Sequence, residues 1–389
     1  MNKKIAIIIS PNYKDYARKY LAEGVDSLRK QDYAGEMKIF MTDNESTEES
    51  YGYLKSMLPE AEIVRNINND GFAKGNNDAI KLALKQGFDY VILFNMDTVL
   101  ETDCIRKMVE AMDDEKLFLD SRLRGNDKRE VGNDGKEIGA VQARIMLYKE
   151  NLTPASPYKG EGTINSLGNV THFLGFGYAL GYGEEYVRLP RRSEYGTPRN
   201  DNNICYPSGA AVLFNKEALE KVGLFDEEFW MYNEDQDLGW RLWLAGYKCV
   251  LAPDAVAYHK YEFSRSIKKY YFMDRNRIMA MLKNYHWATL ALIFPAFIIM
   301  ELGLLFFAAR KGWFKEKINV YKYFLQSKNW RYIMAARRQV QKLRQVKDKD
   351  IIKLFSGKIW YQEIGDGKLK IANVIFSAYW KLIKILIRW

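Results

Sequence analysis

Polar clusters rich in Asp, Asn and Gly recur through the first 240 residues of this chain, at the ends of apolar runs short enough to be strands. The first run, Ile5–Ser10, is continuously apolar, which is typical of a parallel strand covered on both faces. Ligands of open α/β sheets bind beyond the carboxyl ends of the strands, so the clusters together predict one built site, and their carboxylates predict a metal, a sugar or both. The clusters are Ser10–Tyr13, Thr42–Ser46, Asn68–Asn77, Phe94–Asp97, Pro207–Ala211 and Asn233–Arg241.

The periodicity of the apolar residues predicts strands that alternate with helices, which indicates a doubly wound, mostly parallel α/β sheet. Helices are expected at Tyr16–Lys30, Asn77–Gln86 and Glu234–Ala245. Further strands are expected at Met37–Thr42, Glu62–Arg65, Tyr90–Asn95, Ile138–Ile145, Ile204–Asn215 and Tyr247–Ala252.

Two stretches lack this periodicity. Residues 113–137 contain the near-repeat RGNDKRE-VGNDGKE, which is polar and Gly-rich and predicts a surface insertion. An acceptor-binding loop is the functional alternative for this insertion. The stretch Ser156–Tyr206 is rich in Gly and Tyr and predicts loops and short strands over the sheet.

Charge divides the chain into two regions. Residues 260–389 hold 27 Lys/Arg and 8 Asp/Glu, a net charge of +19, whereas the rest of the chain carries a net charge of −9. Such a basic region predicts binding to an anionic membrane surface or to nucleic acid. Its many apolar and aromatic residues, such as Trp330, Phe355 and Trp380, favour the lipid surface, so we expect no nucleic-acid partner.

The most hydrophobic segment is Trp287–Ala309, and roughly 20 apolar residues can span a bilayer. A single crossing would place the basic tail outside, against the positive-inside rule. We therefore expect this helix to lie in, or re-enter, the cytoplasmic face of the cell membrane, with Leu369–Trp389 as a second interfacial helix. A single transmembrane helix near residues 288–309 is one alternative, and helices that only pack on each other are another.

Two clusters could hold a metal and a phosphate. Asp97 follows an expected strand, and Mg²⁺ and Mn²⁺ are usually held by one or two carboxylates plus substrate phosphates, which makes Asn95-Met96-Asp97 a candidate ligand segment. In the cluster Asn68–Asn77, Gly71 and Gly75 would let backbone N–H groups approach a phosphate beside a helix that begins near Asn76. An ordinary Gly/Asn turn is the alternative for this cluster.

Other acidic residues suit a nucleoside and a general base. Asp43 follows the second strand, where its carboxylate could accept a hydrogen bond from a nucleobase or a ribose hydroxyl. Glu234, Asp235 and Asp237 open a helix, whose N-terminal dipole keeps carboxylates ionised, as a base must be. Asp237 and Arg241 are four residues apart and can pair along that helix. N-terminal capping is the structural alternative for these acids.

As a set, these motifs resemble the inverting glycosyltransferases of family 2, which have the GT-A nucleotide-sugar-binding fold, and most of all a rhamnosyltransferase-like branch of cell-surface polysaccharide assembly. The resemblance covers about residues 3–285. It includes the Asn-Tyr turn after the first strand, Thr42–Ser46, Asn69–Asn77, Asn95–Asp97, Ser208–Ala210, Gly223–Glu227, Glu234–Arg241 and Pro253–His259.

The resemblance implies a role for each matching residue. Asp235 would be the general base, and Asp97 would bind a divalent metal, Mn²⁺ or Mg²⁺, together with His259. The donor, a UDP- or dTDP-sugar, would be bound by Asn12, Asp43, Asn69, Gly71, Asn76 and Asn95. Glu234, Asp237 and Arg241 would contact the acceptor or support the helix. Asn95 replaces the first Asp of the family's D-x-D motif, which removes one charge from the metal site.

The implied chain has a GT-A catalytic domain over residues 1–285 and a basic, apolar, helical membrane-associated region over residues 286–389. It would transfer a sugar with inversion, such as a rhamnosyl group, to a saccharide or lipid-linked saccharide. A catalytically inactive sugar-binding or scaffold protein at the membrane is the alternative. A processive synthase would need several membrane helices and a Q-x-x-R-W motif, and a nucleotidyltransferase would usually have a Gly-rich basic turn after the first strand, whereas this chain has Ser10–Tyr13 there.

Overall fold

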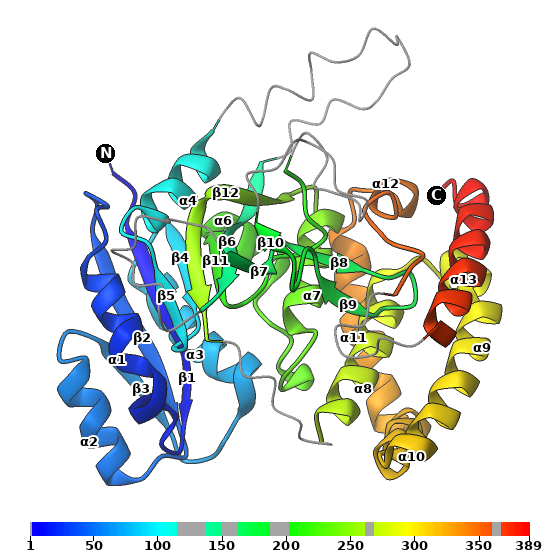
Figure 1. Cartoon of the computed structure of the whole chain (residues 1–389), viewed down its shortest axis with the longest axis horizontal. Helices are drawn as coiled ribbons and strands as arrows, with labels where there is room; N and C mark the ends of the chain where they lie inside the picture. Colours follow the sequence, from blue (N-terminus) through cyan, green and yellow to red (C-terminus); the bar gives the residue numbers. More distant parts are fainter. Residues whose placement is uncertain (1, 115–136, 149–161, 187–201, 261–267, 360–366) are drawn as a thin grey trace, which may run out of the picture.

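A central strand, β1 (Ile5–Tyr13), lies inside a ten-stranded sheet in the computed structural model of this chain (Figure 1). The structure describes residues 2–114, 137–148, 162–186, 202–260, 268–359 and 367–389. Residues 5–9 of β1 are buried, as the continuous apolar run predicts. The strand pairs in parallel with β2 (Met37–Asn44) on one side and β4 (Tyr90–Phe94) on the other, and β3 (Glu62–Asn66) extends the sheet in parallel beyond β2.

Helices cover both faces of this parallel part. Ile7 and its alternate neighbours pack with α1 (Tyr16–Arg29) and α4 (Cys104–Asp113) on one face. Ile8 packs with α3 (Gly71–Lys85) on the other face. The short helix α2 (Glu48–Met57) connects β2 to β3. Because side chains alternate along a strand, one apolar run supplies two cores, which is the doubly wound arrangement that the sequence predicts.

The other half of the sheet is mixed in direction. Strand β11 (Ala211–Asn215) lies antiparallel between β4 and β6 (Ile138–Leu147). Strand β12 (Lys248–His259) runs parallel to β6 and antiparallel to β5 (Thr98–Leu100). The α/β class is confirmed, with the parallel pairs gathered around β1.

The Gly- and Tyr-rich stretch forms short strands, as expected for its described residues. They are β7 (Gly162–Ser166), β8 (Asn169–Thr171), β9 (Gly177–Ala179) and β10 (Glu185–Tyr186). Residues 115–136 of the predicted insertion lie outside the described residues.

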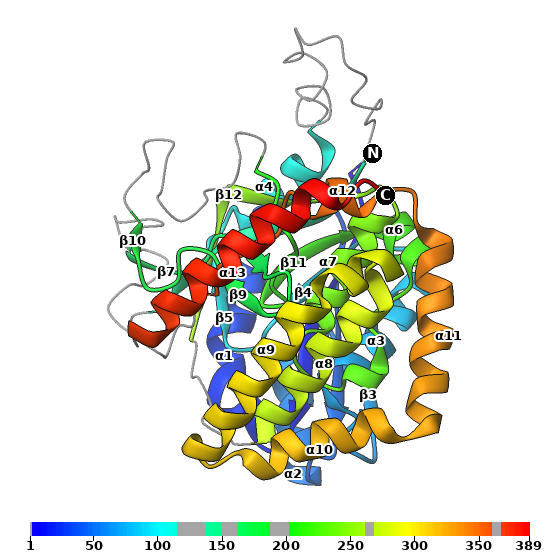
Figure 2. The same cartoon turned by 90° about the vertical axis from the view of Figure 1, so that its right-hand side faces the viewer.

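Between β11 and β12 the chain forms α6 (Lys216–Val222), the 3-10 helix η1 (Glu227–Phe229) and α7 (Glu234–Leu244). Six further helices follow the sheet on the side turned to the viewer in Figure 2. They are α8 (Lys268–Asn284), α9 (Trp287–Lys311), α10 (Phe314–Leu325), α11 (Ser327–Leu343), α12 (Asp348–Ile351) and α13 (Gly367–Leu386).

These helices share a core with the sheet layers. The ring of Phe173 stacks on Trp380 of α13 with centroids 4.7 Å apart, and Trp240 of α7 meets Phe355 edge-on at 4.8 Å. Where the predicted domain boundary at residue 285 falls, α8 of the first region packs against α10 and α11 of the second. Among the described residues, α9 is the one helix long and apolar enough to cross a membrane.

Three predicted boundaries are wrong. Helix α3 begins at Gly71 and not near Asn76, because the backbone N–H groups of Phe72 and Ala73 donate to the carbonyl of Trp230, far away in sequence. Strand β12 continues past Ala252 to His259, because its second half pairs with β5. Of the stretch 204–215, only residues 211–215 form a strand.

Candidate active site

Asp97 and His259 meet at the edge of the sheet. Asp97 lies in the turn between β4 and β5, and antiparallel pairing places Thr98 opposite His259. The Nε2 atom of His259 lies 3.2 Å from an Asp97 carboxylate oxygen, and its Nδ1 atom lies 3.2 Å from Oδ1 of Asn165. The backbone N–H of Lys260 donates to the Asp97 carbonyl at 2.8 Å, which fixes the turn to β12. Strand pairing therefore brings together two residues that are 162 positions apart.

This pair fits a divalent cation. A carbonyl oxygen on Nδ1 favours the imidazole tautomer whose Nε2 can be a ligand, a common arrangement around metal-bound histidines. Asn95, two residues before Asp97, has a buried Oδ1 atom with no hydrogen-bond partner. In the described part of the chain no three His, Cys, Asp or Glu side chains gather tightly enough to hold a metal by themselves. Ions of this class usually take their remaining ligands from water and substrate phosphates, so the donor set of Asn95, Asp97 and His259 is compatible with one.

Asp235 stands at the first turn of α7, preceded by Asn233 in a left-handed conformation with φ 64°. Its Oδ1 atom accepts a hydrogen bond from the backbone N–H of Gln236 at 2.8 Å. Burial raises the pKa of Asp235 to about 6, although the backbone N–H groups of Gln236 and Gly209 favour the ionised form. Asp235 is therefore ionised at neutral pH but basic enough to take a proton.

Its neighbour Glu234 has a different environment. The side chain is buried, and its Oε2 atom has no hydrogen-bond partner. Burial, together with the charge of Asp235, raises the pKa of Glu234 to about 8. The two adjacent carboxyl groups thus titrate apart, which is a frequent property of acid and base pairs in active sites.

The segment Ser208-Gly209-Ala210 links the two candidate groups. The carbonyl of Ala210 accepts from the backbone N–H of Asn95 at 3.1 Å, and the backbone of Gly209 hydrogen-bonds Asp235. The N–H of Ser208 donates to Oε1 of the buried Gln142 at 2.7 Å. One short segment therefore contacts both the Asn95–Asp97 turn and the start of α7.

Asp237 and Arg241 lie in the interior. Asp237 accepts from Nε of Arg241, Nζ of Lys283 and Nδ2 of Asn284, each at 2.9 Å. Burial would raise the pKa of Asp237, but the charges of Lys283 and Arg241 outweigh it, and the pKa is lowered. Arg241 also donates to the carbonyls of Val222, Gly223 and Leu224. These contacts hold α7 to α8 and to the turn after α6.

On the side of the predicted donor, Asn12 and Asp43 are paired. Nδ2 of Asn12 donates to Asp43 at 2.8 Å, and the Oδ1 atom of Asn12 accepts from the N–H of Ala17 at the start of α1. Asp43 is fully buried, and its second oxygen accepts from Ser46 at 2.5 Å and lies 3.6 Å from Nε of Arg65. The two residues form one polar unit at the ends of β1 and β2.

The remaining predicted donor residues lie at the start of α3. The N–H of Gly71 donates to Oδ1 of Asn69 at 3.1 Å, and Gly71 has a φ of +80°. A Cβ atom on Gly71 would stand 2.5 Å from the Trp230 ring, so this glycine is needed for both its conformation and its space. Asn76 is buried one turn further on, where its Nδ2 donates to the Phe72 carbonyl and its Oδ1 has no partner. In this structure the backbone N–H groups of residues 71–73 donate to Asn69 and to the Trp230 carbonyl.

Sequence reasoning missed several residues that complete this region. Asn165, which orients His259, lies in a stretch without a readable pattern. Gln142 lies in a mostly apolar strand, where the sequence pattern predicts burial but no polar role. Two further residues support the segment before α7, Trp230 and Asn276. Each hydrogen-bonds with residues that are distant in the sequence, and no local motif predicts such bonds.

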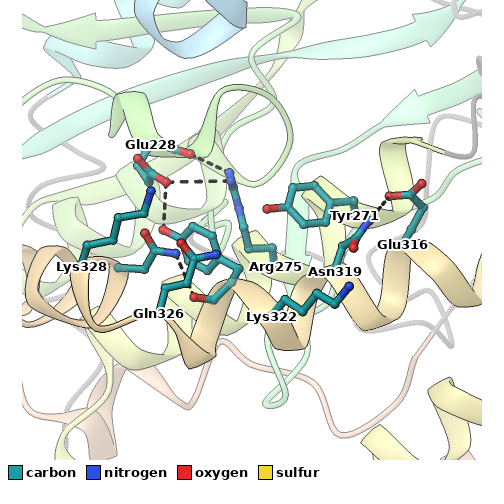
Figure 3. A pocket seen from close by; sticks show the side chains of 10 residues that line it. Glu228, Tyr271, Arg275, Glu316, Asn319, Lys322, Gln326 and Lys328 are labelled. Atoms are coloured by element: carbon teal, nitrogen blue, oxygen red, sulfur yellow. Dashed lines mark hydrogen bonds and ion pairs between the residues drawn. The ribbon is translucent and has the colours of Figure 1, made fainter.

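A separate cavity of about 550 Å³ lies between η1, α8 and the α10–α11 region (Figure 3). Its lining is polar, with Tyr271, Arg275, Lys322 and Asn329 among its residues. The Asp97–His259 pair and Asp235 are not part of this lining. The chemically distinctive groups therefore do not coincide with this cavity, and we place the candidate site by its side chains.

Comparisons with known proteins bear on the family of this chain. The sequence model described as "Glycosyl transferase family 2" matches residues 7–223, which is more than half of the chain. Two curated proteins of Mycobacterium tuberculosis (strains CDC 1551 / Oshkosh and ATCC 25618 / H37Rv), both named N-acetylglucosaminyl-diphospho-decaprenol L-rhamnosyltransferase, are 38% identical over 82 residues. That match covers 20% of this chain and 27% of each relative, so the chain spans about a quarter of their length.

Solved structures show more distant likeness. S. aureus TarS 1–349 in complex with UDP is 16% identical with a TM-score of 0.42, over 99% of this chain and 91% of that one. The mannosyltransferase PcManGT from Pyrobaculum calidifontis with GDP-Man and Mn²⁺ is 12% identical with a TM-score of 0.45, over 100% of this chain and 89% of that one. GalNAc-T7 with UDP, GalNAc and Mn²⁺ is 14% identical with a TM-score of 0.47, over 72% and 48%. On the family match, which covers residues of both the donor side and the Asn95–Asp97 turn, this chain belongs to glycosyl transferase family 2 and is a glycosyltransferase.

Proposed function

We propose that this glycosyltransferase moves a sugar from a UDP- or dTDP-sugar to a hydroxyl of a saccharide or lipid-linked saccharide, with inversion at the anomeric carbon. The observation that carries the proposal is the placement of Asn95–Asp97 and Asp235 against the same segment, Ser208–Ala210. A donor-binding group and a base beside one another are what a single displacement needs. The printed name of the M. tuberculosis relatives supports rhamnosyl transfer to a lipid-linked acceptor, and hence a role in cell-surface polysaccharide assembly.

In this proposal the donor diphosphate lies at Asn95, Asp97 and His259, and the nucleoside lies toward Asn12 and Asp43. A divalent cation, Mn²⁺ or Mg²⁺, held by those three diphosphate-side residues would neutralise charge on the leaving diphosphate. Asn165 keeps His259 oriented through Nδ1, at 3.2 Å. Asn69, Gly71 and Asn76 shape the donor side through the start of α3 and not through free backbone amides.

Asp235 acts as the general base. Its carboxylate takes the proton of the acceptor hydroxyl as that oxygen attacks the anomeric carbon from the face opposite the diphosphate, and one displacement inverts the configuration. Glu234 keeps a neutral carboxyl beside it, because burial raises its pKa to about 8. Asp237 and Arg241 support the helix from inside and do not touch the reacting atoms.

We further propose a place at the cytoplasmic face of a membrane, and the described surface supports contact with lipid. Phe294, Ile298, Leu302 and Phe306 are spaced four residues apart and form an exposed apolar stripe along α9. Helix α13 lies beside α9 (Figure 2), and its Tyr379 donates to the carbonyl of Leu292. The second helix adds its own exposed apolar side chains, Val374, Ile375, Leu382, Ile385 and Leu386.

Next to this stripe, α9 is bound to the rest of the protein. Glu301 is buried, pairs with Arg277 of α8, and accepts from Lys317 of α10 at 2.6 Å. Lys317 also bonds Asp274 of α8 at 2.6 Å. A crossing helix would have to take Glu301 into hydrocarbon without these partners, which is costly. We infer that α9 and α13 lie in one leaflet, with residues 286–389 as the membrane-associated region and residues 1–285 as the catalytic domain.

A donor panel tests the proposed function. The purified protein is incubated with UDP-, dTDP- and GDP-sugars, with and without Mn²⁺ or Mg²⁺, and the thermal shift and slow donor hydrolysis are measured. We expect a metal-dependent response to one UDP- or dTDP-sugar that is lost in Asp97→Ala and His259→Ala and kept in the exposed-residue control Asp254→Ala. No response to any sugar nucleotide would overturn the proposal and favour an inactive scaffold. A response kept in Asp97→Ala would remove Asp97 from the donor site.

A further inference from the structure

The segment that leads into α7 has an unusual backbone. Between η1 and Asp235, Trp230, Tyr232 and Asn233 have φ values of 59°, 69° and 64°. Non-glycine residues rarely adopt such conformations, and three within four positions persist only if the surroundings hold them. The segment is short and carries Glu234 and Asp235 at its end, so whatever holds it also sets the position of the predicted base.

Helix α8 supplies the support. Asn276 is fully buried, and its Nδ2 donates to the carbonyls of Phe229 and Met231 at 2.9 Å and of Tyr232 at 2.7 Å. Oδ1 of Asn276 accepts from Nε of Arg275 at 2.9 Å. The two N–H groups of one side-chain amide are therefore shared among three carbonyls in and beside the left-handed residues.

Arg275 extends this support to η1. Its guanidinium donates to the carbonyl of Glu228 at 2.6 Å and to that of Phe229 at 3.2 Å. Figure 3 shows Arg275 reaching from α8 to Glu228 along the wall of the polar cavity. One turn before these residues on α8, Phe272 stacks on the ring of Trp230 with centroids 4.8 Å apart. The spacing of residues 272, 275 and 276 places all three on one side of α8.

The supported segment also contacts the donor side. The carbonyl of Trp230 accepts from the N–H groups of Phe72 and Ala73 at 2.8 and 3.1 Å. The indole Nε1 of Trp230 donates to the Asn69 carbonyl at 3.4 Å. The hydrogen bonds of Asn276 go to the carbonyls of Phe229, Met231 and Tyr232, whereas the carbonyl of Trp230 accepts from α3. Asn276 therefore supports the part of the segment that leads to the predicted base, and α3 bonds the part next to the donor side.

We propose that Asn276, oriented by Arg275, is a positioning residue that fixes the approach of Asp235 to the acceptor hydroxyl. This inference rests on the proposed function, because it assumes that Asp235 is the base. Misplacement of a catalytic group by about 1 Å can cost roughly 100-fold in rate. Loss of the hydrogen bonds of Asn276 should therefore lower turnover without weakening the binding of the donor.

The test measures kcat and donor KM for hydrolysis of the sugar nucleotide that responds in the donor panel, with water as the acceptor. For Asn276→Ala we expect kcat to fall about 10- to 100-fold while donor KM stays within about threefold. Arg275→Lys keeps the charge but loses the two-carbonyl contact, and we expect a smaller fall in the same direction. If Asn276→Ala does not fold, Arg275→Lys alone decides the outcome.

A matched control and a reference variant separate the possible results. Asn373 of α13 also bonds the backbone, where it accepts from the N–H and donates to the carbonyl of Ile359, so Asn373→Ala should lower stability with kcat unchanged. Asp235→Asn is measured in parallel. If Asp235→Asn abolishes turnover while the variants at residues 275 and 276 keep wild-type kcat, the positioning role is overturned. If Asp235→Asn itself keeps turnover, the proposed base is wrong and the failure lies there.

Discussion

At the residue scale, two adjacent carboxyl groups have different surroundings. Asp235 is partly exposed and hydrogen-bonded by backbone N–H groups, whereas Glu234 is buried with an unpartnered oxygen. Burial raises the pKa of Asp235 to about 6, and burial together with the charge of Asp235 raises the pKa of Glu234 to about 8. At neutral pH Asp235 is therefore mostly ionised, whereas Glu234 next to it is mostly neutral.

Glu234 should make stability depend on pH. Its pKa is about 8 in the folded protein against 4.5 for the ordinary group, so the folded state holds the proton more tightly. The resulting contribution is present below pH 4.5 and is lost as the pH rises to about 8. Glu234→Gln removes this loss, and we expect it to stabilise the protein at pH 8 by a few kcal/mol relative to wild type and to have little effect near pH 4.5.

Urea unfolding of wild type and Glu234→Gln at several pH values measures this difference. The exposed Glu217→Gln serves as the control for a simple change of net charge. A stability difference that does not grow between pH 5 and pH 8 would show that Glu234 is not buried as a neutral acid.

At the scale of elements, an ion network joins α7 to α8. Asp237 is fully buried and accepts three hydrogen bonds of 2.9 Å from Arg241, Lys283 and Asn284. Removal of one partner from a buried pair leaves an uncompensated charge and usually costs about 3–5 kcal/mol. We expect Asp237→Asn to destabilise the protein by this amount, with donor affinity of the folded fraction unchanged. Unfolding and donor titration measure the two quantities, and a cost no larger than that of the exposed Asp254→Asn would contradict the network's role.

The contact between α3 and the segment before α7 allows a matched comparison of two glycines. Gly71 and Gly87 both have a φ of +80°, but a Cβ on Gly71 meets the Trp230 ring at 2.5 Å, while nothing lies within 4 Å of one on Gly87. Gly87→Ala should therefore lower the free energy of unfolding by about 1 kcal/mol, because of the backbone conformation alone. Gly71→Ala should lower the free energy of unfolding clearly more than Gly87→Ala, and it should also weaken donor binding. Equal stability losses would show that Trp230 does not press against the start of α3.

Local sequence predicted the elements better than their partners. The apolar run at Ile5–Ser10 and the periodicity of residues 16–30 identify β1 and α1, because the order of apolar and polar residues along each element determines which side chains are buried. The start of α3 at Gly71 could not be read, because its cap is the Trp230 carbonyl.

The candidate site shows the same division. Asp97 can be identified from its position directly after a predicted strand. Asn165 and Asn276 belong to no sequence motif, and their partners lie more than 40 residues away in the chain. The antiparallel insertion of β11 between β4 and β6 also depends on tertiary pairing, which alternation of strands and helices does not specify.

At the scale of the whole molecule, the apolar sides of α9 and α13 face away from the sheet while the buried Glu301 cluster keeps α9 against α8 and α10. Basic residues at the ends of these helices, such as Lys311 and Arg388, suit anionic headgroups. The reaction would then take place beside a leaflet that holds a lipid-linked acceptor.

Liposome flotation checks this arrangement. Leu302 is 64% exposed on α9. We expect Leu302→Asp to reduce binding to anionic vesicles at least about tenfold, since it replaces an apolar group that would enter the lipid with a negative charge. Ile67 is 92% exposed beyond β3, the strand at the edge of the sheet, so Ile67→Asp should bind like wild type. Equal binding by both variants would contradict the assignment of this face to a lipid surface.

The most direct test of the central claim is the rate of sugar release from the responding donor by wild type and Asp235→Asn across pH, with donor-induced thermal shift measured alongside. We expect Asp235→Asn to lower the rate about 10²- to 10⁴-fold while the thermal shift is kept. The wild-type rate should fall below about pH 6, because the base becomes protonated there. A variant rate close to that of wild type, with the same pH profile, would contradict the account.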